Sequence, residues 1–400
     1  MQCSTPGACV AVGDGGGIVF DVGSLWDRLT AVTDTRHRRG VRYPLDALLV
    51  LLTLAKVAGA DQLSAMADWV TNRQEALRAA LGLGWARMPH HNTFRRILAS
   101  VVDPDELDGV IGTFLSSLPQ TGTSVVVAFD GKTVRGTIDL DQPHGEHLLA
   151  AYLPEAGLVL MQVAAGEKEN EITVAPKLLT CLDLRGKVVI ADAMHTQRHL
   201  SVQILEAGGE YLWVVKDNQP TLRADIVQVF APETPTVLGN TLPNDWETFQ
   251  TVEKGHGRRE TRTITVSSLL HGYSDWPGLE QVFKVERQRV EVRRGKGTTE
   301  VVYGLTSLRR DEASPQRLLA LSRTYWGIEN GLHYCRDVTF QEDRCRLTQG
   351  NAGRVMATLN NLVIGLLRST GTTNLAQARR RYDADFTQAL PLLTATPLRL

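Results

Sequence analysis

Two short aliphatic runs in the chain each lead directly into an aspartate. The first is VVVAF before Asp130, and the second is VVIA before Asp192. Runs of this kind are typical of strands that are covered on both faces, usually in a sheet with helices above and below. A carboxylate at the end of such a strand is unfavourable unless it is paired or binds a metal ion. The sequence therefore predicts a layered α/β core in which both aspartates have a specific role.

The elements around these two runs follow an order that defines a mixed sheet. Three strands joined by Gly and Pro turns come first, and helices and strands then alternate. This order matches a ribonuclease-H-like core, in which the first and fourth strands are neighbours. Asp130 and Asp192 are therefore expected to lie close together. The expected strands are 124–136, 147–154, 157–166, 187–194 and 210–217, and the expected helices are 172–182 and 197–209.

Changes of pattern divide the rest of the chain. Helical spacing from Leu25 to Leu118 predicts about five helices. Residues 218–310 are polar, rich in turns and contain three strand-like segments, and helical spacing resumes at 315–340 and 351–369. The predicted division is a disordered N-terminus at 1–20, an all-helical N-terminal domain at 21–120, the mixed-sheet core at 121–217 and 311–370, a β-strand insertion at 218–310 and a C-terminal tail at 371–400.

Composition and cysteine usage exclude several kinds of protein. Apolar residues make up 43% of the 400 residues and charged residues 22%, as in soluble globular proteins. The five cysteines form no C-x-x-C pair, which argues against a disulfide framework and a zinc knuckle. The longest apolar stretch, 43–60, is broken by Asp46 and Lys56 and is short for a membrane span. We expect a soluble, cytoplasmic protein.

Charge patterning gives a weaker signal for nucleic acid. The net charge is −1, and basic runs such as 287–296 are individually more typical of a solvated face. Residues 88–98, MPHHNTFRRIL, resemble the second half of a helix-turn-helix, with Arg95 and Arg96 near the start of the helix. Any amphipathic helix with two arginines would match this pattern, so it suggests a DNA-reading helix without establishing one.

The paired aspartates favour a divalent cation. Two buried carboxylates at hydrogen-bonding distance repel each other, and one would take up a proton. Mg²⁺ or Mn²⁺, which prefer hard oxygen ligands, would remove that conflict. A single aspartate after a strand is more often the cap of a turn or helix. Two in the same context, on neighbouring strands, favour a metal site.

A third ligand is expected from the helix predicted at 315–340. Glu329 and Asp337 are candidates, and the weaker alternatives Glu342 and Asp343 fall at or beyond the helix end. At about 100° per residue, Asp337 lies roughly 80° further round than the face of Glu329. The face of Glu329 is shared by the residues Tyr325, Trp326, His333 and Arg336.

Seven stretches carry a resemblance that spans about residues 25–370. The chain resembles bacterial insertion-sequence transposases with a DDE triad, of the ISAs type that includes the H-repeat-associated proteins. The matching stretches are DTRHRRGVRYPLDALLVLLTLAKVAGA (34–60), FDGKTVRGT (129–137), EKENEITVAPKLL (167–179), ADAMHTQ (191–197), YLWVVKDNQPTL (211–222), EKGHGRRETR (253–262) and YWGIENGLHYCRDVTFQEDRCR (325–346).

The resemblance implies a function and a set of site residues. Asp130, Asp192 and Glu329 would be the acidic triad, holding two Mg²⁺ ions or Mn²⁺ as a substitute. The activity would be strand cleavage at insertion-sequence ends and strand transfer to target DNA, by a homodimer in the synaptic complex. The partners would be double-stranded inverted repeats and target DNA. Residues predicted to contact DNA are Arg95, Arg96, Lys132, Arg135, Lys168, His256, Arg258, Arg259, Arg323 and Arg336.

The chain departs from the related signature around the glutamate. Arginine is expected four residues before Glu329, where this sequence has Tyr325, and lysine is expected seven residues after it, where Arg336 stands. The nearest arginine before the glutamate is Arg323. For Glu171, in the EKENE stretch, the open readings are a supporting acid or the start of a helix.

Three other functions remain open on the sequence alone. The chain could be a domesticated, catalytically inactive DNA-binding homologue, a ribonuclease-H-like nuclease without strand transfer, or a non-catalytic interaction module. Inverted repeats flanking the gene, a strand-joining assay and Mg²⁺ or Mn²⁺ binding would separate these readings from a transposase.

Overall fold

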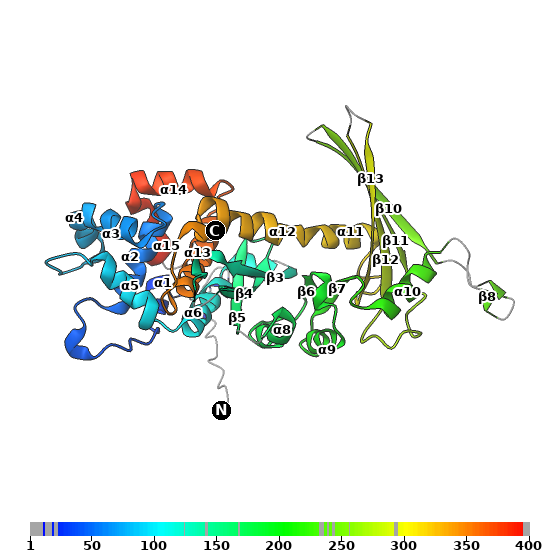
Figure 1. The fold of residues 1–400 in the computed structure, drawn as a ribbon, viewed down its shortest axis with the longest axis horizontal. Coiled ribbons are helices and arrows are strands. Elements are labelled where there is room, and N and C mark those ends of the chain that lie inside the picture. The colour runs from blue at the N-terminus through cyan, green and yellow to red at the C-terminus, as the bar shows by residue number, and fades with distance from the viewer. Residues whose placement is uncertain are drawn as a thin grey trace.

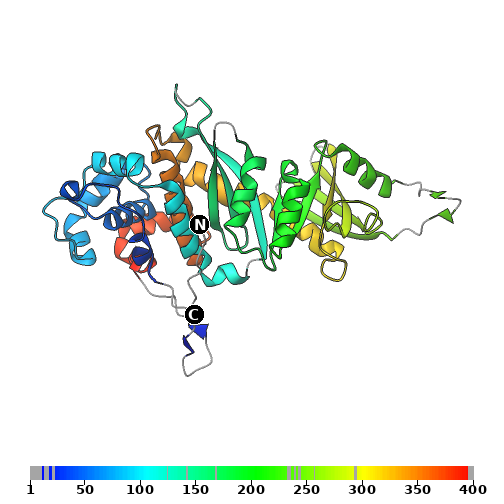
Figure 2. The ribbon, with the colours of Figure 1, turned by 90° about the horizontal axis from the view of Figure 1, so that it is seen from below.

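The molecule is elongated, and its parts follow one another along the long axis (Figure 1). N-terminal and C-terminal helices pack together at one end, a sheet with covering helices forms the middle, and long strands extend from the other end (Figures 1 and 2). The computed structural model describes residues 11–12, 18–19, 23–123, 125–140, 143–166, 169–231, 236–237, 240–241, 245–255, 257–291 and 295–394.

The middle of the molecule is built on five strands of one mixed sheet. β3 (Val126–Val134) lies between β4 (Glu146–Leu153) and β6 (Val188–Ala191), with β5 (Leu158–Ala165) and β7 (Glu210–Val215) outside them. β6 is parallel to both β3 and β7, whereas the pairs β3–β4 and β4–β5 are antiparallel. The expected pairing of the first and fourth strands is confirmed.

Helices cover both faces of this sheet. α8 (Glu171–Thr180) and α9 (Arg198–Glu206) lie on one face, and α11 (Pro315–Thr324) and α12 (Trp326–Ile328) run across the other (Figure 1). β6 is buried at every position, as its continuous aliphatic run predicts for a strand between two helical layers. A mixed α/β architecture is therefore present.

The predicted β-strand insertion extends the central sheet. It begins with a helix, α10 (Pro220–Val229), and contains a small pair, β8 (Thr236–Val237) and β9 (Asn240–Thr241). Four longer antiparallel strands follow, with β13 paired to β7 from Tyr303↔Val215 to Thr306↔Leu212. Sequence analysis expected three of these strands and missed the edge strand β10 and the helix α10. The four strands are β10 (Glu247–Gly255), β11 (Arg258–Ser267), β12 (Gln281–Glu291) and β13 (Gly297–Thr306).

The N-terminal part is helical, as expected, and it contains more helices than the spacing predicted. Residues 61–81, within the stretch of helical spacing, form two helices, because Arg73 leaves the helical conformation with φ −113° and ψ 19°. Of the predicted disordered N-terminus, Ala11–Val12 (β1) pairs with Ile18–Val19 (β2), and the remainder of 1–20 lies outside the described residues. The helices are α1 (Leu25–Leu29), α2 (Leu45–Val57), α3 (Leu63–Asn72), α4 (Gln74–Leu81), α5 (His91–Ser100), α6 (Pro104–Ser116) and α7 (Pro119–Thr123).

The prediction of a C-terminal tail was wrong. After the buried helix α13 (Ala352–Ser369), the chain forms α14 (Leu375–Ala384) and α15 (Pro391–Thr394). Arg379 of α14 donates to Asp61 Oδ1 at 2.6 Å and to the Lys56 carbonyl at 3.2 Å, so this segment packs back onto the N-terminal helices. No helix in the described part of the chain has the length and apolarity of a membrane span.

A buried polar cluster joins the N-terminal helices to the sheet. The carboxylate of Asp108 in α6 accepts hydrogen bonds from Gln162 of β5 at 3.0 Å and from Thr358 of α13 at 2.8 Å. Arg354 of α13 lies 3.5 Å away. Burial raises the pKa of Asp108 to about 7, although Arg354 and both hydrogen bonds oppose the rise.

We predict that Asp108→Asn changes the pH dependence of stability. Between the unfolded pKa near 4 and the folded pKa, the native carboxyl holds a proton that the unfolded chain has lost, so wild-type stability falls as pH rises. Relative to the variant, the free energy of unfolding should fall by up to about 1.4 kcal/mol per pH unit. Urea unfolding from pH 4 to 7 measures this, with Asp217→Asn, at a side chain 97% exposed, as control. Parallel curves for wild type and Asp108→Asn would contradict the prediction.

Candidate active site

The two aspartates lie where the parallel pairing of β3 and β6 stops. The register runs from Val126↔Val188 to Phe129↔Ala191, and Asp130 and Asp192 are the next residues on the two strands. Asp192 ends its strand as expected, and its Oδ1 accepts from the Ala193 amide at 2.7 Å in the turn Ala193–His195. Asp130 does not end its strand, because β3 continues to Val134 against β4.

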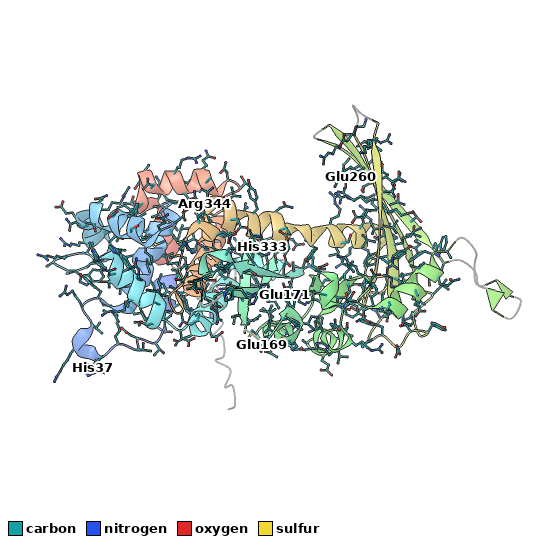
Figure 3. All side chains as sticks on the ribbon, viewed as in Figure 1. His37, Glu169, Glu171, Glu260, His333 and Arg344 are labelled. Carbon is teal, nitrogen blue, oxygen red and sulfur yellow. The ribbon has the colours of Figure 1, made fainter. Side chains whose placement is uncertain are left out.

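The segment that carries Glu329 docks onto Asp130. Tyr325 Oη donates to Asp130 Oδ1 at 3.3 Å, and His333 Nε2 lies 3.1 Å from Asp130 Oδ2 (His333 is labelled in Figure 3). These two residues stand four positions before and four after Glu329. Both oxygens of Asp130 therefore contact the helical segment that carries the glutamate. From Glu329 to His333 the backbone is π-helical, a conformation frequent at functional sites.

Tyr325 is affected by all three of the predicted acids. Burial raises the pKa of Tyr325, and the negative charges of Asp130, Asp192 and Glu329 raise it further. Tyr325 thus contacts Asp130 directly and lines the same cleft as Asp192 and Glu329. Asp130 is 16% exposed and Asp192 46%, and Glu329 faces solvent.

The donor set has the chemistry that a hard cation needs, although its members are held apart here. All three side chains offer carboxylate oxygens, which suit Mg²⁺ or Mn²⁺. Within the described ranges, no group of three His, Cys, Asp or Glu side chains is close enough to hold a metal ion. Asp130 is occupied by Tyr325 and His333, and Asp192 Oδ1 lies 3.2 Å from Lys216 Nζ. These are the contacts that binding a shared ion would replace.

A cleft of about 740 Å³ opens between the carboxylates and the insertion strands. Asp192, Tyr325 and Glu329 line one side. The opposite side carries Arg262 of β11 with Arg287 and Arg289 of β12. Arg262 and Arg287 are direct cross-strand partners, and Glu260 forms ion pairs with both. The cleft thus brings Asp192 and Glu329 together with several arginines, and Lys216 and Glu300 also line it.

Sequence reasoning missed the arginines of this cleft. The run 287–296 was interpreted as a solvated face. Its period-two spacing was the available signal, because alternate residues of a strand share one face, and Arg287 and Arg289 therefore point together. His147, which contacts Glu171, was also not singled out.

Most of the predicted DNA-contacting residues are accessible. Lys132 is one exception: its side chain is 10% exposed and its Nζ lies 2.6 Å from Asp337 Oδ1. Arg323 lines the cleft and pairs with Glu253 of β10 at 2.7 Å. Lys168 and His256 lie outside the described residues. The exposed residues are Arg95 and Arg96 on α5, Arg135 after β3, and Arg258 and Arg259 at the start of β11.

Arg336 is not a surface residue, contrary to the prediction. It is fully buried, and its Nε and Nη2 each donate to Glu342 at 2.6 Å. Burial alone would raise the pKa of Glu342, but the charge and hydrogen bonds of Arg336 hold it below its usual value. The predicted face assumed 3.6 residues per turn. Two π-helical turns, Glu329–His333 and Cys335–Thr339, hold more residues per turn, so Arg336 leaves the face of Glu329.

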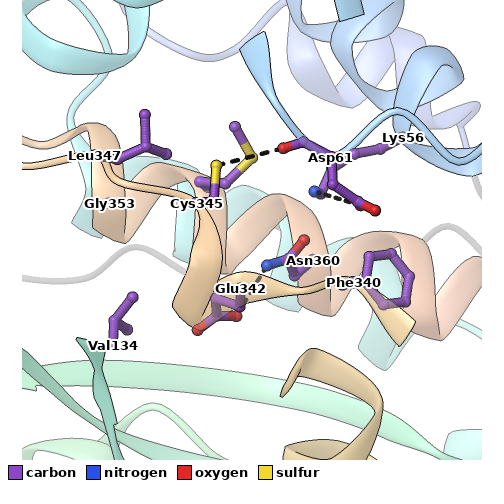
Figure 4. Close-up of a pocket in the computed structure, with 10 residues that line it drawn as sticks. Lys56, Asp61, Val134, Phe340, Glu342, Cys345, Leu347, Gly353 and Asn360 are labelled. Carbon is purple, nitrogen blue, oxygen red and sulfur yellow. Dashed lines mark hydrogen bonds and ion pairs between the residues drawn. The ribbon is translucent and has the colours of Figure 1, made fainter. Parts of the chain in front are cut away.

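Glu342, the acid of this ion pair, lies in a larger polar cluster (Figure 4). Glu342 also accepts from Asn360 of α13 at 2.8 Å. Lys56 of α2, which is 1% exposed, and Asp61 lie across the same small cavity. The segment that follows the candidate active site is therefore anchored to both α13 and the N-terminal helices.

Comparison with known proteins identifies relatives over most of the chain. A family model described as "Transposase DDE domain" matches residues 121–366, and one described as "DDE_Tnp_1-associated" matches residues 26–115. "Putative transposase YncI" of Escherichia coli O157:H7 is 30% identical, over 87% of this chain and 88% of that protein. "H repeat-associated putative transposase YhhI" of Escherichia coli strain K12 is 27% identical, over 87% and 91%.

One solved structure shows a remote likeness. It is the cryo-EM structure of the piggyBac transposase synaptic complex with hairpin DNA, with a TM-score of 0.44 and 10% sequence identity. The match covers 95% of this chain and 79% of that one. At this level of similarity it adds nothing to the description of the site.

We predict that Glu342→Gln destabilises the fold and that Arg344→Ala does not. The first change leaves the Arg336 guanidinium buried without its counter-charge, which should lower the free energy of unfolding by about 3–5 kcal/mol. Arg344, labelled in Figure 3, is exposed in the same segment and serves as the matched control. Urea unfolding of both variants provides the measurement. Equal stability of Glu342→Gln and wild type would return Arg336 to the DNA-contacting residues.

Proposed function

Because the chain belongs to the family of transposases with a DDE domain, we propose that it cleaves DNA at the ends of an insertion sequence and joins the freed strands to a target DNA. The observation that carries this proposal is the position of Tyr325. Its phenol donates to Asp130 and lines the same cleft as Asp192 and Glu329, and Arg262, Arg287 and Arg289 line that cleft as well. A phosphodiester is anionic, and that arrangement places a negatively charged substrate between cations and the groups that act on it.

The strand arrangement supports a ribonuclease-H-like core. The order β5-β4-β3-β6-β7, with three antiparallel strands followed by two parallel ones, brings the two aspartates together from strands that are far apart in the sequence. Two Mg²⁺ ions, or Mn²⁺ in their place, held by Asp130, Asp192 and Glu329 would lower the pKa of an attacking water or 3′-hydroxyl and stabilise the leaving oxygen.

The protein's own side chains orient the reacting groups. Before an ion binds, Tyr325 and His333 hold both oxygens of Asp130, so the carboxylate is kept in one orientation. Arg289 and the paired Arg262 and Arg287 neutralise phosphates on the far side of the cleft, a contribution that positions DNA without reading its sequence. Because the cleft is lined partly by buried apolar side chains such as Phe283, these charges act in a medium less screened than bulk water.

Recognition of the element's ends is assigned to the N-terminal helices. Arg95 and Arg96 are exposed on α5, where they can reach base edges or phosphates. Arg258 and Arg259 lie at the exposed end of the insertion strands. We further propose that two copies act together when two DNA ends are brought into one complex, and that the protein works in the cytoplasm on the nucleoid.

We predict that Asp192→Asn abolishes metal-dependent nicking of a supercoiled plasmid carrying the element's own ends. The loss should be about 10³-fold or more, equivalent to about 4 kcal/mol of transition-state stabilisation. Asp275→Asn, at a side chain 88% exposed, is the control and should cleave normally.

The same assay separates the alternative functions. End binding by wild type without cleavage would indicate an inactive DNA-binding homologue, and cleavage without joining would indicate a nuclease. Equal cleavage by wild type and Asp192→Asn would remove Asp192 from the reaction.

We predict that Arg289→Ala weakens binding to all DNA sequences equally. Arg289 lines the cleft, where its guanidinium charge can contact a phosphate of bound DNA. The slope of log affinity against log salt should fall by about 1. Arg185→Ala, at the opposite end of β6 from Asp192 and 81% exposed, should leave the slope unchanged. An unaltered slope for Arg289→Ala would place the DNA elsewhere.

A further inference from the structure

Three polar side chains form a hydrogen-bonded cluster behind the two aspartates. Glu171 Oε1 lies 2.9 Å from His147 Nε2, and Glu171 Oε2 lies 3.1 Å from His195 Nε2. The three residues come from different elements: the first turn of α8, strand β4 and the turn after Asp192. Figure 3 labels Glu171 in the middle of the molecule.

The cluster is mostly inaccessible to solvent and holds its charge firmly. The side chains of Glu171 and His195 are 14% and 1% exposed. Burial alone would raise the pKa of Glu171, but hydrogen bonds from His147 and His195 lower it to about 2. A buried carboxylate with both oxygens engaged is a rigid connection, because losing one partner would leave a desolvated charge.

One side of the cluster touches the strand of Asp130. A Cβ at Gly131, the residue directly after Asp130, would lie 2.2 Å from Glu171 Oε1 and 2.7 Å from His147 Nε2. His147 also reaches β3 through Thr133 Oγ1, at 2.9 Å from its Nδ1. Glu171 is thus packed against the backbone of β3 at the site itself.

The other side of the cluster holds the turn that follows Asp192. His195, three residues after Asp192, is fixed by Glu171 on the side of β3. On the side of β7, Asn218 Nδ2 donates to the Ala193 carbonyl at 2.7 Å and Thr196 Oγ1 donates to the Val214 carbonyl at 2.6 Å. The turn is held from both sides, and Glu171 supplies the link toward Asp130.

We propose that Glu171 is a positioning residue that fixes the separation of Asp130 and Asp192 by bracing the ends of β3 and β6 through His147 and His195. The inference rests on the proposed function, because it assigns to that separation the binding of the divalent cations. It also gives a role to the EKENE stretch, which is outside the acidic triad.

The experiment measures Mn²⁺ binding directly, by the paramagnetic resonance signal of free Mn²⁺, on the full-length protein. Glu171→Gln keeps the shape of the side chain and removes its charge. The dissociation constant for Mn²⁺ should rise about tenfold, the lower end of the effect of losing a supporting residue around metal ligands. Affinity for the DNA ends should stay within about twofold, since the cluster does not face the cleft. Glu169→Gln, exposed in the same stretch and labelled in Figure 3, is the matched control.

A second pair of variants keeps the test decisive if Glu171→Gln does not fold. His147 is 31% exposed, so His147→Ala removes one arm of the brace at lower structural cost. It should weaken Mn²⁺ binding, and His147→Gln, whose amide can still donate to Glu171, should restore it. A purely structural role would lower the melting temperature without this rescue of Mn²⁺ affinity.

The outcomes separate this inference from the proposed function. A wild-type protein that neither binds Mn²⁺ nor cleaves DNA overturns the proposed function and the brace with it. A wild type that does both, with unchanged Mn²⁺ affinity in Glu171→Gln and His147→Ala, overturns the positioning role alone.

Discussion

The parallel pairing of β3 with β6 is the constraint on which the candidate active site depends. It brings together residues 62 positions apart in the chain, as 192 minus 130, and stops where both strands reach an aspartate. Beyond that point the strands diverge: β3 stays paired with β4, and β6 gives way to a turn. The divergence creates room for two carboxylates and for the phenol of Tyr325 in a region that is otherwise closely packed.

The helical segment from α11 to Thr339 is held on the sheet by polar contacts at several points. Tyr325 and His333 attach it to Asp130, and Arg336 attaches its end to Glu342. The two contacts with Asp130 can be exchanged, since a bound cation would compete for the same oxygens. The Arg336–Glu342 pair is buried, so losing one partner would leave an uncompensated charge. This pair therefore holds the end of the segment wherever the protein is folded.

The parts of this structure that could be predicted from the sequence are those in which the spacing of apolar residues fits only one kind of element. The run before Asp192 is apolar at every position and was correctly interpreted as a buried strand. The edge strand β10 was missed because seven of its nine residues, including Glu253 and Lys254, are exposed, and the sequence there resembles a polar segment rich in turns. Arg336 was placed on the same helix face as Glu329 because no pattern in the sequence predicts a π-helical turn. α14 was taken for a tail because its stability comes from distant partners, as when Arg379 contacts Asp61.

The backbone ladder between β13 and β7 makes the insertion a continuation of the sheet. A lobe tethered only by flexible linkers could swing about a hinge to admit a substrate. Here such a swing would break paired backbone groups and pull β10 and β11 away from α11, against which both strands pack. The spacing between the arginines and the acids is therefore set when the chain folds. In the proposed complex with DNA, the substrate enters a cleft of fixed width, so the fit depends on how readily the DNA itself can bend or unpair.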